Sequence, residues 1–227
     1  MSKINKICST LLCFFLLLTT IITVIDFCCF DKKFYHNEYA KLHTAKDIGV
    51  SDKSLDIMTD TLLDYLKDDI NSLDLKLEVN NIKREIFDTR EKLHMVDVKD
   101  LYQKAIAVRN ISLVFALCSL VVLIFNNKFS YLKQGYIKAL SFFGFIFAFI
   151  GLFCLIDFNS FWTNFHKIFF TKNDYWLLDP RTELLIQMVP SQFFFDLCIR
   201  IIAIIVFMLI LYYFLFNFID KKVRDND

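Results

Sequence analysis

Three side chains in the middle of the chain could support acid–base chemistry. His94 lies three residues after Glu91 and three residues before Asp97, in a segment whose pattern predicts a helix. Residues three apart lie on the same face of a helix, so either carboxylate could reach the imidazole. A carboxylate partner fixes the tautomer of a histidine and raises its basicity. Glu91 and Asp97 are therefore candidate supporting residues for His94, and a structural role for His94 stays open.

A second histidine, His166, lies in the aromatic run Phe161–Phe170. Such aromatic density is typical of a membrane interface, where these rings would act as anchors. A titratable group among aromatic rings is partly desolvated, which opens its pKa to tuning. Both histidines lie next to predicted membrane spans, so a helix bundle could bring them together for acid–base work on a lipid or lipidated substrate. His36 and His43 lie in a more polar stretch and are expected at the surface.

Other catalytic motifs are missing from the sequence, which contains no nucleophile elbow, no H-E-x-x-H, no P-loop and no dinucleotide fingerprint. The seven cysteines fall inside or beside apolar runs, which argues against a disulfide framework, a zinc ribbon or an exposed thiol nucleophile. A net charge of +1 provides no basic field for nucleic acid. We therefore expect no cofactor, no metal and no nucleic-acid partner.

The elements that must position these histidines are membrane helices. The chain of 227 residues is 56% hydrophobic with only four Gly and two Pro, and four windows reach the roughly 20 apolar residues that a bilayer requires. These windows are 7–30, 106–125, 139–156 and 197–218. The first lacks a small-residue cleavage site and a lipid-modification signal, so we expect an uncleaved helix. The predicted fold is an all-α integral membrane protein with a four-helix transmembrane bundle.

The segments between the spans also carry structural signals. Ser51 can cap a helix with apolar residues at helical spacing from Leu55 onward. Residues 73–79 alternate between apolar and charged, as in a half-buried strand. Asp88 or Thr89 can cap the helix that carries His94. We therefore expect a mostly helical outer domain with minor β structure, together with an aromatic-rich outer loop.

Lysine and arginine predict the orientation, because they concentrate on the cytoplasmic side of short connections. They occur in the two tails and in the connection 127–138, at Lys3, Lys6, Lys128, Lys133, Lys138, Lys221, Lys222 and Arg224. Both termini are therefore expected in the cytoplasm and the site at the outer leaflet. The expected segments are 1–30 (tail and first span), 31–104 (outer domain), 105–126 (second span), 127–138 (cytoplasmic loop), 139–156 (third span), 157–192 (outer loop), 193–219 (fourth span) and 220–227 (tail).

Four charges lie near the outer ends of the predicted spans, namely Asp26, Arg109, Asp157 and Arg200. Charges within a membrane are costly and are commonly kept for function, so these residues could line a polar cavity. They could equally extend toward the interface or pair with one another. Arg109 and Arg200 are also candidate donors to an oxyanion.

Two strings in the sequence resemble a known family. They are Phe87-x-x-Arg90-Glu91-x-x-His94-Met95-x-Asp97-Val98 and Phe165-His166-x-Ile168-Phe169-Phe170, the second followed by Trp176, Asp179-Pro180, Leu185-Ile186 and Pro190. With the four spans, they resemble the lipoprotein intramolecular transacylases (Lit) of Gram-positive bacteria over nearly the whole chain. The resemblance implies transfer of the sn-2 acyl chain of a diacylglyceryl-modified lipoprotein to the α-amine of its own N-terminal Cys. It also implies that His166 is the principal acid–base catalyst and that His94 assists.

Two further hypotheses come from other functional classes. A non-catalytic membrane chaperone or assembly factor would tolerate substitution of both histidines. A metal-dependent lipid hydrolase could use His94, His166 and Asp97 as ligands and would lose activity with a chelator.

Overall fold

The computed structural model describes residues 2–126 and 129–226. The predicted cytoplasmic residue Lys128 and the side chain of Arg224 lie outside this description. The chain divides into two compact units, one formed by residues 1–27, 105–156 and 198–227 and the other by residues 28–104 and 157–197. We refer to the first as the span unit and to the second as the cap unit.

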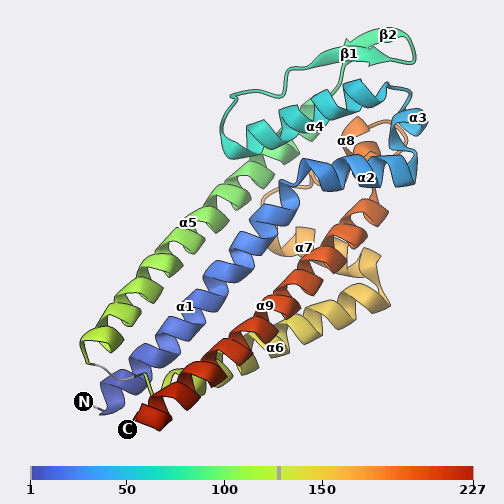
Figure 1. The fold of residues 1–227 in the computed structure, drawn as a ribbon. Helices are drawn as coiled ribbons and strands as arrows, with labels where there is room; N and C mark the ends of the chain where they lie inside the picture. Colours follow the sequence, from blue (N-terminus) through green and yellow to red (C-terminus); the bar gives the residue numbers. More distant parts are fainter. Residues whose placement is uncertain (1, 127–128, 227) are drawn as a thin grey trace. The chain divides into compact units, whose positions relative to one another are not determined.

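The span unit contains most of four long helices, drawn in Figure 1: α1 (Ser2–Cys29), α5 (Thr89–Phe125), α6 (Leu132–Ile156) and α9 (Ser191–Asn226). All four are long and apolar enough to cross a membrane. Residues 89–104 of α5 are rich in charge and belong to the cap unit, and the sequence predicts that the second span begins at residue 105. These helices confirm the predicted all-α, four-span class.

In the span unit, part of the buried face of α5 consists of small and polar residues. The buried face of α5 repeats at helical spacing through Ser112, Ala116 and Ser119, whereas large apolar residues such as Phe115 face outward. Small residues allow helix backbones to approach closely where lipid, not water, surrounds the bundle. Two helix backbones approach closely at Gly135 of α6, where a Cβ atom would lie 2.5 Å from the backbone oxygen of Ser9 in α1.

The cap unit contains the shorter elements: α2 (Lys32–Leu42), α3 (Thr44–Ile48), α4 (Asp52–Lys67), β1 (Lys76–Val79), β2 (Ile82–Glu85), α7 (Phe158–Phe169) and α8 (Leu184–Met188). Helix α4 begins as predicted, since the Ser51 hydroxyl accepts a hydrogen bond from the Ser54 amide at 3.1 Å. Its buried residues include Leu55, Met58 and Leu62. The apolar spacing of the sequence therefore marks the buried face of α4 correctly.

The predicted strand is shorter than expected and has a partner. Of the alternating residues 73–79, only Lys76–Val79 forms a strand, which pairs antiparallel with β2 in the register Lys76 opposite Glu85. The connecting residues Asn80 and Asn81 both have positive φ. Asparagine tolerates this conformation, which a tight hairpin turn requires. The Asn-Asn pair is the signal in the sequence that marks the hairpin.

The segment 157–192, expected to be a loop, contains helices α7 and α8 and the first residues of α9. Helix α7 begins after Asp157, whose carboxylate accepts a hydrogen bond from the Ser160 amide at 3.0 Å. Its aromatic residues fall three or four positions apart, at Phe158, Phe161, Trp162, Phe165 and Phe169. This spacing produces one aromatic face on a helix. His166 therefore lies on a helix rather than in a loop.

Candidate active site

The two histidines predicted from the sequence lie next to each other inside the cap unit. Their ring centroids are 5.8 Å apart, and both side chains are buried, with 7% of each residue exposed. His94 lies in the first turns of α5, and His166 lies near the end of α7. These positions are 72 residues apart in the sequence, so only tertiary packing brings the two rings together.

A backbone contact defines the tautomer of His166. Its Nδ1 atom is 2.8 Å from the carbonyl oxygen of Trp162, one helical turn earlier. A carbonyl oxygen only accepts, so Nδ1 must carry the hydrogen. The neutral imidazole then has its lone pair on Nε2. This nitrogen can take a proton from a substrate and later return it.

Aromatic rings surround the imidazole of His166. Trp176 is stacked on it with a centroid distance of 5.1 Å, and Trp162 contacts it edge-on at 4.8 Å. Phe170 contacts the rings of both histidines, at 5.5 Å from His166 and 5.2 Å from His94. The pair therefore lies in an apolar environment with little water.

Burial decides the charge state of both histidines. It lowers the pKa of His94 to about 4, and the nearby charge of His166 acts in the same direction, while Asp97 opposes it. Burial also lowers the pKa of His166, which the hydrogen bond to the Trp162 carbonyl partly offsets. An uncharged imidazole is the state that accepts a proton. The lowered pKa values therefore favour the uncharged state of both histidines near neutral pH.

The two candidate supporting carboxylates have partners other than His94. The two oxygens of Glu91 accept hydrogen bonds from the amides of Asp88 and Leu185, both at 2.6 Å. Asp97 accepts a hydrogen bond from the side-chain amide of Asn173 at 2.9 Å. The Nδ1 atom of His94 is buried without a hydrogen-bond partner in the described part of the chain. Among the described residues, neither Glu91 nor Asp97 therefore hydrogen-bonds this Nδ1 atom, and the supporting role of the two carboxylates stays a prediction.

Glu91 instead organises the start of α5. Its amide donates to the Asp88 carboxylate at 2.9 Å while its own carboxylate accepts from the Asp88 amide, which is a capping box. The bond to the Leu185 amide ties the start of α8 to α5. Burial raises the pKa of Glu91 against the effect of these two amides. Glu91 thus fixes the helix that carries His94, one turn before that residue.

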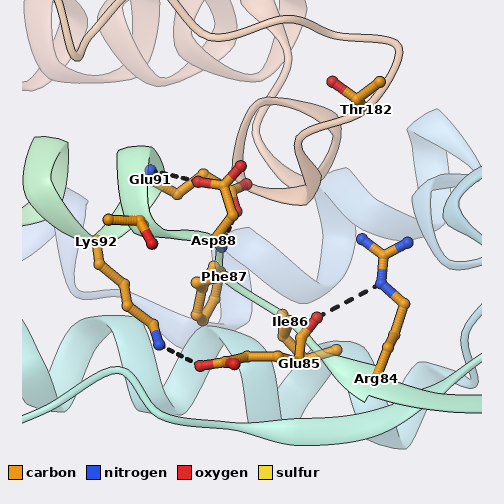
Figure 2. Close-up of a pocket in the computed structure, with 9 residues that line it drawn as sticks. Arg84, Glu85, Ile86, Phe87, Asp88, Glu91, Lys92 and Thr182 are labelled. Carbon is orange, nitrogen blue, oxygen red and sulfur yellow. Dashed lines mark hydrogen bonds and ion pairs between the residues drawn. The ribbon is translucent and has the colours of Figure 1, made fainter.

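A cavity of about 290 Å³ borders the same capping box. Its lining comprises residues between Arg84 and Lys92 together with Thr182, and neither histidine is among them. Figure 2 shows that the charged groups around it are already engaged, with Lys92 on Glu85 and Glu91 on Asp88. The cavity is therefore a polar recess beside the start of α5, whereas the reactive nitrogens belong to the aromatic cluster.

The remaining predicted charges occupy other places. In the span unit, Arg109 donates to Asp26 at 3.0 Å, so these two charges pair with each other. The guanidinium of Arg200 lies over the Phe27 ring at 6.0 Å. Asp157 caps α7. Among the residues that the structure describes, no group of three or more His, Cys, Asp or Glu side chains could hold a metal ion.

Several site residues escaped prediction because their contacts are distant in sequence. In the sequence, Trp176 and Arg90 stand out only through the two strings, and Asn173 has no predicted role. Arg90 donates to the Asp174 carbonyl at 2.7 Å, and Asn173 binds Asp97. The only signal available was the occurrence of Arg90, Asp97 and Trp176 inside the two strings that contain the histidines.

Comparisons with known proteins identify the family and the fold. The model of the family described as "Lipoprotein intramolecular transacylase Lit" matches residues 10–194. A solved structure of the membrane-integral lipoprotein intramolecular transacylase Lit from Bacillus cereus is 21% identical, covers 99% of both chains and has a TM-score of 0.82. A variant of that protein with one histidine replaced by arginine is 22% identical over 100% of this chain and 96% of that chain, with a TM-score of 0.77. No curated protein sequence matches the chain. At such identities the solved structures establish the fold of a membrane-integral protein.

Proposed function

The chain belongs to the lipoprotein intramolecular transacylase family, and from that premise we propose that it converts diacylglyceryl-modified lipoproteins into their N-acyl lyso-form. The sn-2 acyl chain moves to the α-amine of the N-terminal Cys of the same lipoprotein. The observation that carries this proposal is the buried pair His94 and His166, whose rings lie 5.8 Å apart. A pair of uncharged imidazoles suits a reaction that consists of one acyl shift and two proton transfers.

The atoms balance without a covalent enzyme intermediate. The uncharged α-amine attacks the ester carbonyl, so a C–N bond forms and the C–O bond to glycerol breaks. His166 Nε2 takes the proton that the nitrogen loses, and the leaving glyceryl oxygen receives a proton in return. Donor and acceptor belong to one molecule, so their effective concentration is high once they are held in register. A Ser or Cys nucleophile is not required.

His94 assists from the opposite side of the pair. Its buried Nδ1 has no hydrogen-bond partner among the described residues, and its pKa of about 4 keeps the ring uncharged. An uncharged imidazole both donates and accepts a hydrogen bond, so in this proposal the ring of His94 binds the amine or the glyceryl oxygen of the substrate. His94 thus orients the substrate, and His166 moves the proton.

The proposed location follows from the distribution of charge. Lysines and arginines in both tails and in the connection between the second and third spans place these parts in the cytoplasm. The cap unit and its histidines then face the outer leaflet, where lipoproteins are anchored. The proposed partners are diacylglyceryl-modified lipoproteins and membrane lipid.

The test is the acyl pattern of a lipoprotein co-expressed with the wild-type protein or with His166→Ala. Intramolecular transfer leaves the mass of the N-terminal peptide unchanged, so the readout is fragment-ion mass spectrometry together with labelling of free amines. We expect N-acyl monoacylglyceryl-Cys with the wild type and a loss of turnover of about 10²–10⁴-fold with His166→Ala. Wild-type yield from a His166→Ala protein present at normal level would contradict the assigned mechanism.

The same assay separates the competing functions. A chaperone or assembly factor would leave the acyl pattern unchanged, and a hydrolase would release the acyl chain as a fatty acid. A metal-dependent reaction would stop with a chelator and resume with zinc.

A further inference from the structure

We infer that Trp176 is a positioning residue for the reaction: it holds the His166 imidazole in its reactive orientation by stacking on it. This inference rests on the proposed role of His166. The tryptophan ring is stacked with an interplanar angle of 30° and a centroid distance of 5.1 Å. The ring lies in the irregular segment between α7 and α8, far outside the local turn of α7.

Trp176 lies farther from His166 in the sequence than most of the other rings around that residue. Trp162, Phe165 and Phe170 lie within four residues of His166, so their contacts follow from the local path of the chain. Trp176 is ten residues away and reaches the imidazole only because the chain folds back. Among the rings of the described residues, His94 is the other distant contact. Trp176 therefore restricts rotation of the imidazole in a way that α7 alone does not.

Two contacts from the helix of His94 hold the segment that carries Trp176. On one side of His94, Asp97 accepts a hydrogen bond from Asn173 at 2.9 Å. On the other side, Arg90 donates to the carbonyl of Asp174 at 2.7 Å. Helix α5 thus presents His94 and, through the turn at 173–174, places Trp176 against His166.

Stacking also suits the charge that His166 acquires during the reaction. When Nε2 takes the proton from the amine, the imidazole becomes a cation against the face of an indole. A cation over an aromatic face is stabilised, and tryptophan is the best such face. Trp176 would therefore favour the protonated intermediate as well as the correct orientation.

The first experiment compares Trp176→Leu, Trp176→Phe and the matched control Phe169→Leu in steady-state assays with a diacylglyceryl lipopeptide. Phe169 is a half-exposed ring of α7 that packs on Phe165. We expect Trp176→Leu to lower kcat roughly 3- to 30-fold with KM within about twofold, because stacking and the cation contact act after binding. Trp176→Phe should restore most of the rate, and Phe169→Leu should resemble the wild type. Wild-type kcat in Trp176→Leu, or no rescue by phenylalanine, would overturn the inference.

A spectroscopic test remains decisive if Trp176→Leu does not fold. The chain has two tryptophans, and both contact His166. A protonated imidazole quenches indole emission by accepting an electron from the excited ring. In a Trp162→Phe protein, emission from Trp176 should fall on acidification, and this fall should disappear when His166→Gln is added. If the pH dependence of Trp176 emission were the same with and without His166→Gln, the stack would not form.

The outcomes distinguish this inference from the proposed function. An active His166→Ala protein would refute the role of His166 whatever Trp176 does. An inactive His166→Ala protein combined with a fully active Trp176→Leu protein would refute only the positioning role.

Discussion

The lowered pKa of His94 has a consequence for stability as well as for catalysis. The unfolded chain binds a proton at His94 near pH 6.5, whereas the folded chain binds it only near pH 4. Between these values the unfolded state holds more protons, so the free energy of unfolding falls as pH falls. Acidification therefore lowers the free energy of unfolding through the titration of His94.

This loss of stability can be measured by thermal unfolding in detergent at pH 7 and pH 5. His94 should account for a loss of about 2 kcal/mol between these two conditions. In His94→Gln this part is absent, so its melting temperature should depend less on pH than that of the wild type. All other titratable groups are the same in the two proteins, so the difference in their pH dependence reports the titration of His94. An identical pH dependence in both proteins would show that the His94 pKa is not lowered.

At the scale of elements, Glu91 joins the start of α5 to the start of α8. Replacing it with alanine leaves the amides of Asp88 and Leu185 without their acceptors. Each unsatisfied buried amide costs about 1–3 kcal/mol, so we expect Glu91→Ala to lower the free energy of unfolding by about 2–4 kcal/mol. Glu78→Ala on the exposed face of β1 is the matched control and should have almost no effect. Equal melting temperatures for the two variants would refute the joining role of Glu91.

Helix α6 offers a second pair of matched substitutions. A Cβ atom at Gly135 would lie 2.5 Å from the Ser9 backbone oxygen, whereas at Gly144 it would meet nothing within 4 Å. Backbone atoms cannot rotate away, so Gly135→Ala should cost about 1–3 kcal/mol. Gly144→Ala should be neutral or slightly stabilising because alanine favours a helix. Thermal unfolding of both variants tests the contact, and a harmless Gly135→Ala would contradict it.

The elements also show what a single sequence could and could not predict. Helix α4 and the start of α5 were predictable because a cap and an apolar spacing are local properties of the chain. The partners of Asp97 and Glu91 were not predictable, because they lie 76 and 94 residues away. Helix α7 was not predicted for another reason: its aromatic residues are also typical of an interfacial belt, so their type did not distinguish a helix from a loop.

At the scale of the whole molecule, the predicted topology places the histidines on the outer side of the membrane. Reporters fused after Lys133 or Asp227 should read cytoplasmic, and reporters fused after Leu77 or Lys172 should read external, because positive residues concentrate in the tails and the short connection. Each fusion is made with two reporters, one active only in the cytoplasm and one active only outside the membrane, and the two activities are compared. A cytoplasmic signal at Leu77 would place the cap unit on the wrong side for a lipoprotein substrate.

Both units of the molecule have features that fit the proposed function. The span unit has the exposed apolar residues of a membrane bundle and small buried residues along α5, and its charges Asp26 and Arg109 pair with each other. The cap unit holds the titratable pair in an aromatic cluster. Membership of the transacylase family and the buried histidine pair therefore point to the same chemistry: proton transfer around an acyl shift within one substrate molecule.

The central claim is tested most directly by a crossover measurement with the purified protein. Two diacylglyceryl lipopeptides of different sequence are mixed, one with deuterated and one with ordinary acyl chains, and the N-acyl products are identified by fragment-ion mass spectrometry. The account predicts that each peptide gains only its own acyl chain on nitrogen, and that His166→Ala forms neither product at an appreciable rate. Ordinary acyl chains on the nitrogen of the deuterated peptide, or wild-type rates from His166→Ala, would contradict it.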